Sequence, residues 1–289
     1  MQAVRTDLAM EQTEFYKNNL PEGLSLSQEE KAGLKITRVE VVSEEGVKLT
    51  GKNKGKYITI DIPLATAGAE PADDVTHLLA QEISALLPKE GMVLVVGLGN
   101  IHITPDALGP QTVHQILATR HIPDQVAKES GLENLRPVAA LAPGVLGQTG
   151  IETGEIIHSI VTDIHPGAVV VIDALAARSL ERMGRTIQLS DNGISPGSGV
   201  LNSRKELSRE TLGVPVISVG IPTVVDGATL VQDLVEKENL PMKKQAQTVM
   251  VTPRDIDVII ERGAKNLSLA INKALQPQLS LEDITYLVS

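Results

Sequence analysis

Long apolar runs mark the middle of the chain. Met92–Val96 (MVLVV) and Ala168–Ile172 (AVVVI) are unbroken and rich in β-branched residues, and Val138–Leu141 and Val214–Val219 have a similar character. Such runs are typical of strands buried on both faces of a parallel sheet. Segments with helical spacing of apolar residues lie between them, at Gly109–Thr119, Ile151–Asp163 and Asp173–Met183. The alternation predicts an α/β fold with a mostly parallel central sheet flanked by helices.

The first part of the chain has a different pattern. Apolar and polar residues alternate in Ile36–Val42, Val47–Leu49 and Tyr57–Ile62, with a Gly- and Lys-rich turn at Gly51–Gly55. This pattern predicts a small antiparallel β element with one solvent-facing side near the N-terminus. The segment before it, Thr6–Asn19, is predicted to be either a mobile arm or a helix.

Two further helices complete the predicted fold. Asp74–Leu87 begins with acidic residues and has helical periodicity, and it follows a loop-like stretch at Ala65–Asp73. Thr252–Ala274 is predicted to be a helix with Thr252 as its cap and Pro253 at its first position. No internal repeat is visible, so we expect one α/β domain.

The composition narrows the possible partners. The chain of 289 residues has 26 basic and 36 acidic side chains, three Tyr, one Phe and no Trp. An acidic chain with few aromatic rings is a poor nucleic-acid binder. The absence of cysteine excludes thiolate nucleophiles and cysteine-ligated metals. No apolar run approaches about 18 residues, and Met1–Asn18 lacks the apolar core of a secretory signal. We therefore expect a cytoplasmic protein that binds neither nucleic acid nor membrane directly.

A further short strand is predicted at Ile187–Leu189. Acidic residues follow this strand and three of the others: Asp106, Asp173, Asp191 and Asp226. Active sites of parallel sheets form outside the carboxyl ends of the strands. Each of these acids alone could simply cap the next helix, but together they are expected to converge on one edge of the sheet. Two carboxylates brought close together share a proton, and such a pair can divide the base and acid roles of amide hydrolysis.

Other chemistries have weaker support. Gly97-Leu98-Gly99 follows a strand, but His102 stands where a dinucleotide loop needs its third glycine. No phosphate-binding loop of the GxxxxGK[ST] type occurs, and the six histidines show no metal-binding spacing. The turn Pro196–Gly199 lacks the spacing of a serine nucleophile elbow, although its backbone N–H groups could face an oxyanion. We therefore expect no cofactor and no metal.

Several distinctive blocks cover most of the chain from residue 90 to residue 274, with one more near the N-terminus. They are Arg5–Ala9, Gly97–Asn100, Thr104–Pro110 (TPDALGP), Ala142–Thr153 (APGVLGQTGIET), Ile172–Arg178 (IDALAAR), Asp191–Val200 (DNGISPGSGV), Leu212–Val216, Gly220–Asp226 and Met250–Pro253. Taken in this order, the blocks resemble the germination proteases of endospore-forming bacteria.

The resemblance implies an atypical aspartic endopeptidase, related in fold to the hydrogenase-maturation endopeptidases. The family's two catalytic aspartates fall on Asp106 and Asp173. The resemblance also implies that the substrates are small acid-soluble spore proteins, that the enzyme works in the forespore and spore core, and that it assembles as a homotetramer.

The family is made as an inactive precursor that removes its own N-terminal propeptide. The cut follows an acidic residue and precedes a large apolar residue and then Ala. Here Thr6-Asp7-Leu8-Ala9 has this pattern, which predicts cleavage between Asp7 and Leu8. The resemblance therefore divides the chain into a propeptide, residues 1–7, and a single protease domain, residues 8–289.

Two departures from the family leave alternatives open. Ser195 stands where family members often carry His, and the region between Asp226 and Thr252 is shorter than in the longer members. One alternative is a metal-dependent endopeptidase similar to the hydrogenase-maturation enzymes, for which the chain lacks a His partner at Ser195. A second is a binding module without catalysis, although both aspartates are present.

Overall fold

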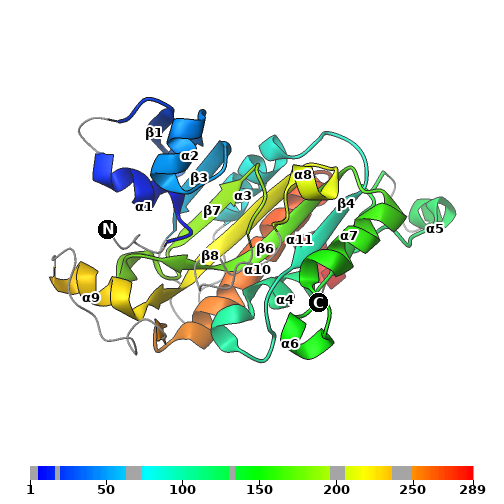
Figure 1. The fold of residues 1–289 in the computed structure, drawn as a ribbon. Coiled ribbons are helices and arrows are strands. Elements are labelled where there is room, and N and C mark those ends of the chain that lie inside the picture. The colour runs from blue at the N-terminus through cyan, green and yellow to red at the C-terminus, as the bar shows by residue number, and fades with distance from the viewer. Residues whose placement is uncertain are drawn as a thin grey trace.

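Residues 6–16, 20–62, 73–129, 134–195, 206–235 and 249–288 are described in a computed structural model of the protein. Their strands form one mixed sheet in the order β1-β2-β3-β7-β8-β6-β4-β5, with β9 paired to β8 (Figure 1). The strands are β1 Leu24–Lys31, β2 Leu34–Val41, β3 Gly55–Asp61, β4 Val93–Gly97, β5 Val138–Leu141, β6 Ala168–Ala177, β7 Thr186–Ser190, β8 Val216–Asp226 and β9 Met250–Val251.

Helices cover both faces of this sheet. The α-helices are α1 Ala9–Thr13, α2 Glu44–Thr50, α3 Asp73–Leu86, α4 Leu108–Val113, α5 Asp124–Glu129, α6 Leu146–Thr149, α7 Thr153–Ile164, α8 Arg209–Leu212, α9 Gly227–Val235, α10 Ile256–Leu275 and α11 Leu281–Val288. The described residues also form the short 3-10 helices η1 Glu14–Tyr16, η2 Thr104–Asp106 and η3 Leu180–Arg182.

The predicted parallel centre is confirmed. Strands β5, β4, β6 and β8 run parallel to one another, while β1, β2, β3 and β7 add an antiparallel half. Alternate residues of the central strands face different helical layers. Val93 of β4 belongs to a core cluster with residues of α3, α4 and α10, whereas Leu94 belongs to a second cluster with residues of α7 and α8. Helices α7 and α8 lie on the opposite face of the sheet from α3 and α10 (Figure 1). Burial on both faces explains the unbroken apolar runs.

Two predicted elements are wrong. Val47–Leu49 lies in helix α2 rather than in a strand, because Ser43 caps the helix by accepting the Gly46 N–H (3.3 Å) and Gly51 ends it in a left-handed conformation. The predicted helix Asp173–Met183 is instead the second half of β6 as far as Ala177, which pairs with β8, followed by the short 3-10 helix η3 at Leu180–Arg182. Backbone pairing here overrides the helix preference of its alanines.

Other predicted elements differ mainly in extent. Helices α3 and α7 lie close to where the pattern places them, whereas α4 is shorter than the predicted Gly109–Thr119. Helix α10 begins four residues after Thr252, whose hydroxyl donates to the Thr223 carbonyl (2.8 Å) instead of capping it. The polar edge strand β1 was not predicted. The N-terminal segment forms α1 and η1, as the helix alternative expected.

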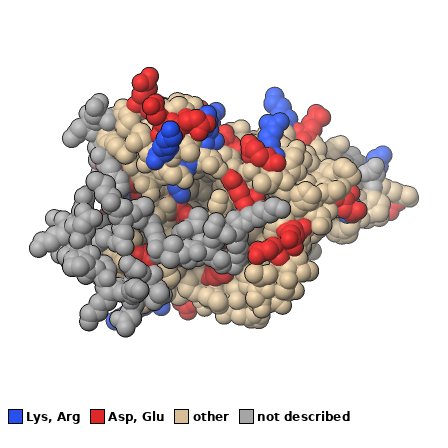
Figure 2. Space-filling model, in the orientation of Figure 1, with Lys and Arg blue, Asp and Glu red and all other residues tan. Residues whose placement is uncertain are grey.

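The surface of the described residues is mixed in charge. On the face drawn in Figure 2, Lys and Arg side chains are interspersed with Asp and Glu and do not gather into a basic patch. Among the described residues, no helix combines the length and the apolar character needed to span a bilayer.

One buried amide ties α10 to the end of α4. The Asn272 side chain is 1% exposed, accepts a hydrogen bond from the Leu117 N–H (2.9 Å) and donates one to the Gln115 carbonyl (2.8 Å). We expect Asn272→Ala to lower the free energy of unfolding by about 1–3 kcal/mol, because it leaves both backbone groups unpaired. Urea denaturation measures this change, and Gln125→Ala on the exposed helix α5 is the control, with little expected effect. An equal loss in both variants would contradict the prediction.

Candidate active site

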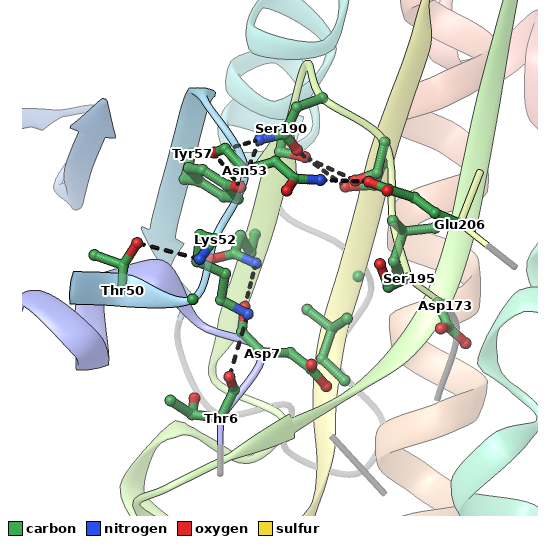
Figure 3. A pocket seen from close by; sticks show the side chains of 18 of the residues that line it. Thr6, Asp7, Thr50, Lys52, Asn53, Tyr57, Asp173, Ser190, Ser195 and Glu206 are labelled. Atoms are coloured by element: carbon green, nitrogen blue, oxygen red, sulfur yellow. Dashed lines mark hydrogen bonds between the residues drawn. The ribbon is translucent and has the colours of Figure 1, made fainter. Parts of the chain in front are cut away.

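A cavity of about 340 Å³ opens where the antiparallel and parallel halves of the sheet meet. Its lining comes from the N-terminal segment, the turn after α2, and strands β3, β6, β7 and β8 (Figure 3). Asp7, Lys52, Asp173, Ser195 and Glu206 all line it. The cavity therefore joins the predicted cleavage segment to one of the two predicted catalytic acids.

Asp173 lies within β6 and not in a loop after it. Its backbone is opposite Gly220 of β8, and the residue is 8% exposed. The carboxylate accepts a hydrogen bond from the Ala174 N–H (2.9 Å). Because the residue before it, Ile172, is the last that pairs with β4, Asp173 stands at the point where β6 leaves one of its two neighbours.

Asp106 is held beside the same point by the loop after β4. The Leu98 N–H donates to the Ile172 carbonyl (2.8 Å), and the Asn100 N–H donates to Oδ2 of Asp106 (2.7 Å). The short helix η2, which ends at Asp106, contacts both β6 and β8. The fold thus brings together the elements that carry the two acids. Asp106 does not line the cavity, and a shared proton between the two carboxylates stays a prediction.

The other two acids do not join this pair. Strand β7 runs antiparallel to β8, so Asp191 follows it toward the opposite end of the sheet, where its carboxylate accepts the Lys56 N–H (2.7 Å). Asp226 lies six residues beyond Gly220 on β8, about 20 Å along the strand. It caps α9 by accepting the Thr229 N–H (3.0 Å). The expected meeting of four acids at one edge is therefore wrong.

The predicted cleavage segment is bound along its backbone. The Asp7 N–H donates to the Ala176 carbonyl (2.8 Å), and the Asp7 carboxylate accepts the Ala176 N–H (2.8 Å). The side-chain amide of Gln188 bonds to the backbone on both sides of Leu8. It donates to the Asp7 carbonyl (2.9 Å) and accepts the Ala9 N–H (2.8 Å). Leu8 and Ala9 are fully buried.

Glu11 fastens the same segment to the end of β6. Its buried carboxylate accepts the N–H groups of Arg178 (2.8 Å) and Ser179 (3.1 Å) and the hydroxyl of Thr6. Burial raises the pKa of Glu11, and the three hydrogen bonds and the Arg178 charge only partly oppose that effect.

Polar groups on the other side of the cavity form a second network. Lys52 is the one basic side chain among the described residues that line the cavity, and its ammonium donates to the Thr6 carbonyl (3.2 Å; Figure 3). Burial lowers the pKa of Lys52 below its ordinary value, and the charges of Asp7 and Glu11 only partly oppose this effect. Burial and the charge of Glu210 raise the pKa of Glu206. The cavity thus contains one ammonium group among several carboxylates.

The remaining predicted features contribute little to the described site. The side chain of His102 is exposed, and its backbone N–H donates to the Asn100 side-chain oxygen (3.0 Å). Within the parts of the chain that the structure describes, no three His, Asp or Glu side chains are placed to hold a metal ion. The Pro196–Gly199 turn, residues 1–5 of the predicted propeptide and most of the 227–251 region lie outside the described residues.

A model of one protein family, described as germination protease, matches residues 3–240. The chain belongs to this family. Curated members from Clostridium perfringens and from Caldanaerobacter subterraneus are 44% and 43% identical to it, over at least 98% of both chains in each case. A member from Priestia megaterium is 36% identical over 97% of this chain and 96% of its own. The resemblance in the sequence is thus confirmed, and the chain is a member of a protease family.

A solved structure gives a more distant likeness. The nickel–iron hydrogenase maturation protease HycI from Thermococcus kodakarensis aligns with 66% of this chain and 98% of its own, at a TM-score of 0.37 and 15% identity.

Sequence reasoning missed Gln188 and Lys52. Gln188 is a polar residue in the middle of a buried strand (TIQLS), which was a usable signal, since a buried amide needs partners. Lys52 lies in a stretch rich in Gly and Lys that reads as an ordinary solvent-exposed turn. Only its approach to the N-terminal segment distinguishes it.

A close backbone contact positions the Asp106 loop against β6. A side chain at Gly109 would collide with the Leu98 carbonyl and lie 2.7 Å from the Ile172 carbonyl. We expect Gly109→Ala to push the loop from β6 and to lower the free energy of unfolding by about 1–3 kcal/mol. Gly147→Ala is the control, because nothing lies within 4 Å of its added carbon. Urea denaturation of both variants checks this, and equal stability would contradict it.

The raised pKa of Glu11 predicts a pH dependence. The folded chain holds this proton more tightly than the unfolded chain, so this contribution to the free energy of unfolding falls as pH rises from the ordinary Glu value of 4.5. Glu11→Gln cannot titrate and lacks this dependence. We expect the wild type to lose stability relative to Glu11→Gln between pH 4.5 and neutrality, as measured by urea midpoints. A relative gain would contradict the prediction.

Proposed function

We propose that the chain is a self-processing aspartic endopeptidase that cleaves small acid-soluble spore proteins in the forespore and spore core. Membership in the germination protease family supports the general activity. One observation carries the specific proposal: Asp7, from the predicted cleavage site, and Asp173, a predicted catalytic acid, line the same cavity.

The proposed chemistry uses Asp106 and Asp173 as a base and acid pair. One carboxylate takes a proton from a water molecule, whose oxygen attacks the carbonyl carbon of the residue before the cut. The other carboxyl group donates its proton to the departing amide nitrogen as the C–N bond breaks. The pair thus begins and ends with one shared proton, and the base and acid roles are not assigned to individual residues.

The bound N-terminal segment is consistent with a latent precursor. Asp7 is paired with Ala176, three residues beyond Asp173, which is about 10 Å along an extended strand. In this conformation the Asp7–Leu8 bond is held away from Asp173, so self-cleavage requires the segment to shift. Release of residues 1–7 would then leave the chain from Leu8 onward as the active enzyme, which we propose to be a tetramer.

Replacing either acid tests the mechanism. The purified wild type, kept at mildly acid pH, should generate a new N-terminus at Leu8, identified by mass spectrometry. Asp106→Asn and Asp173→Asn should each keep their fold and slow this cleavage by about 10²–10⁴-fold, because each removes one of the two proton-transfer groups.

Asp191→Asn is the matched control. Its amide oxygen can still accept the Lys56 N–H, so cleavage should continue at the wild-type rate. Full activity of either Asp106→Asn or Asp173→Asn would reject the assignment. Loss of wild-type cleavage with a strong chelator would favour a metal-dependent enzyme instead.

A further inference from the structure

The edge of β6 beyond Ile172 lacks a neighbouring strand among the described residues. Strand β4 pairs with β6 only from Val93 opposite Ala168 to Gly97 opposite Ile172. Strand β8 continues along the other edge as far as Ala177. Among the described residues, the stretch from Asp173 to Ala177 is therefore paired with a strand on one side only. A strand edge of this kind offers backbone N–H and C=O groups for pairing with another chain.

The direction of the backbone groups along this edge follows from the contacts. The carbonyl of Ile172 points toward β4, since it accepts the Leu98 N–H (2.8 Å). Successive residues of a strand direct their backbone groups to opposite sides, so Ala174 and Ala176 share the side of Ile172. The Ala174 N–H donates to the Asp173 carboxylate (2.9 Å), so the group that Ala174 offers to an added chain is its carbonyl. Ala176 supports this direction across the register shift between Leu175 and Ala176, because both its N–H and its C=O bond to Asp7.

The N-terminal segment already uses one position of this edge. Asp7 satisfies both backbone groups of Ala176, with its own N–H on the carbonyl (2.8 Å) and its carboxylate on the N–H (2.8 Å). Gln188 then bonds to the backbone on both sides of Leu8 and holds the segment in register. The β6 edge therefore bonds to both the backbone N–H and the side chain of Asp7, and Leu8 and Ala9 pack in the same core cluster as Leu175 and Ala177 of β6. The backbone N–H of Asp7 is the contact that any extended chain could repeat at this edge.

The same edge passes the two proposed catalytic acids. Asp173 begins it, and the helix η2, which carries Asp106, contacts β6 beside it. An extended chain that added to this edge would run past Asp173 and bring successive carbonyl groups to the acids. A substrate bound in this way is a strand added to an existing sheet.

We infer that the β6 edge from Asp173 to Ala177 is the substrate-binding groove, and that it takes an extended polypeptide as an added strand. The inference rests on the proposed function. It also explains latency toward other proteins, because the uncut segment occupies Ala176 and blocks the groove until residues 1–7 leave. The binding energy comes from alternate backbone groups of the substrate, whose side chains then only select among sequences.

A methylation scan of a substrate peptide tests this groove. The peptide carries residues 3–14 of this chain, and single backbone N-methyl groups are placed at each position except Leu8, whose nitrogen belongs to the cleaved bond. The self-processed protein is the enzyme, and kcat/KM is measured for each peptide. The carbonyls on the open side of this edge belong to Ala174 and Ala176, so an added strand donates to it from two N–H groups that are two residues apart. We expect losses of about tenfold at those two positions and below about threefold at the others.

The neighbouring methylated positions are the matched controls, since they change the same atoms. Losses of similar size at consecutive positions, or no loss beyond threefold at any position, would overturn the inference while the proposed function stands. If the unmethylated peptide is not cut although the chain processes itself, the groove is also rejected. Failure of self-processing in the wild type would instead reject the proposed function, and the inference with it.

Discussion

The length of β6 is the constraint on which the candidate site depends. Its first half is paired on both sides and its second half only with β8. Asp173 stands at the change, so this acid belongs to a rigid strand and still borders an open edge. The loop after β4 turns away at that level because the Leu98 N–H bonds to Ile172. The same departure positions Asp106 and exposes the edge that Asp7 reaches.

Burial of the N-terminal segment sets a second constraint. Leu8 and Ala9 pack in a small core cluster with residues from β2, β3 and β6, and both are fully buried. Asp7, one residue earlier, is held by hydrogen bonds and lines the cavity. The predicted cleavage site therefore coincides with the border between a polar, cavity-lining end and a packed apolar anchor. Loss of residues 1–7 would remove none of the side chains of this cluster.

Prediction from sequence succeeded where burial dominates. The runs at Met92–Val96 and Ala168–Ile172 are strands because both of their faces are covered, and that requirement is visible in the residues themselves. Prediction failed where strand pairing or helix capping determines the secondary structure. Alanine and leucine in Asp173–Ala177 suit a helix, and only the presence of β8 beside them makes them a strand. The segment predicted as a strand at Val47–Leu49 lies in α2, because Ser43 caps the start of this helix and Gly51 ends it in a left-handed conformation.

The sequence by itself determined the family and the α/β class, because these depend on local patterns and on blocks of matching residues. The same blocks led to Asp106 and Asp173 as the predicted catalytic acids. Tertiary structure alone decided which acids lie near each other. Because β7 runs antiparallel to β8, Asp191 follows β7 in the direction opposite to the end of β6. Because β8 is long, Asp226 lies six residues along it from Gly220, which is opposite Asp173. It also decided the roles of Gln188 and Lys52, whose partners lie in the N-terminal segment, far away along the chain. Such contacts depend on strand direction and register, which no local pattern of residues contains.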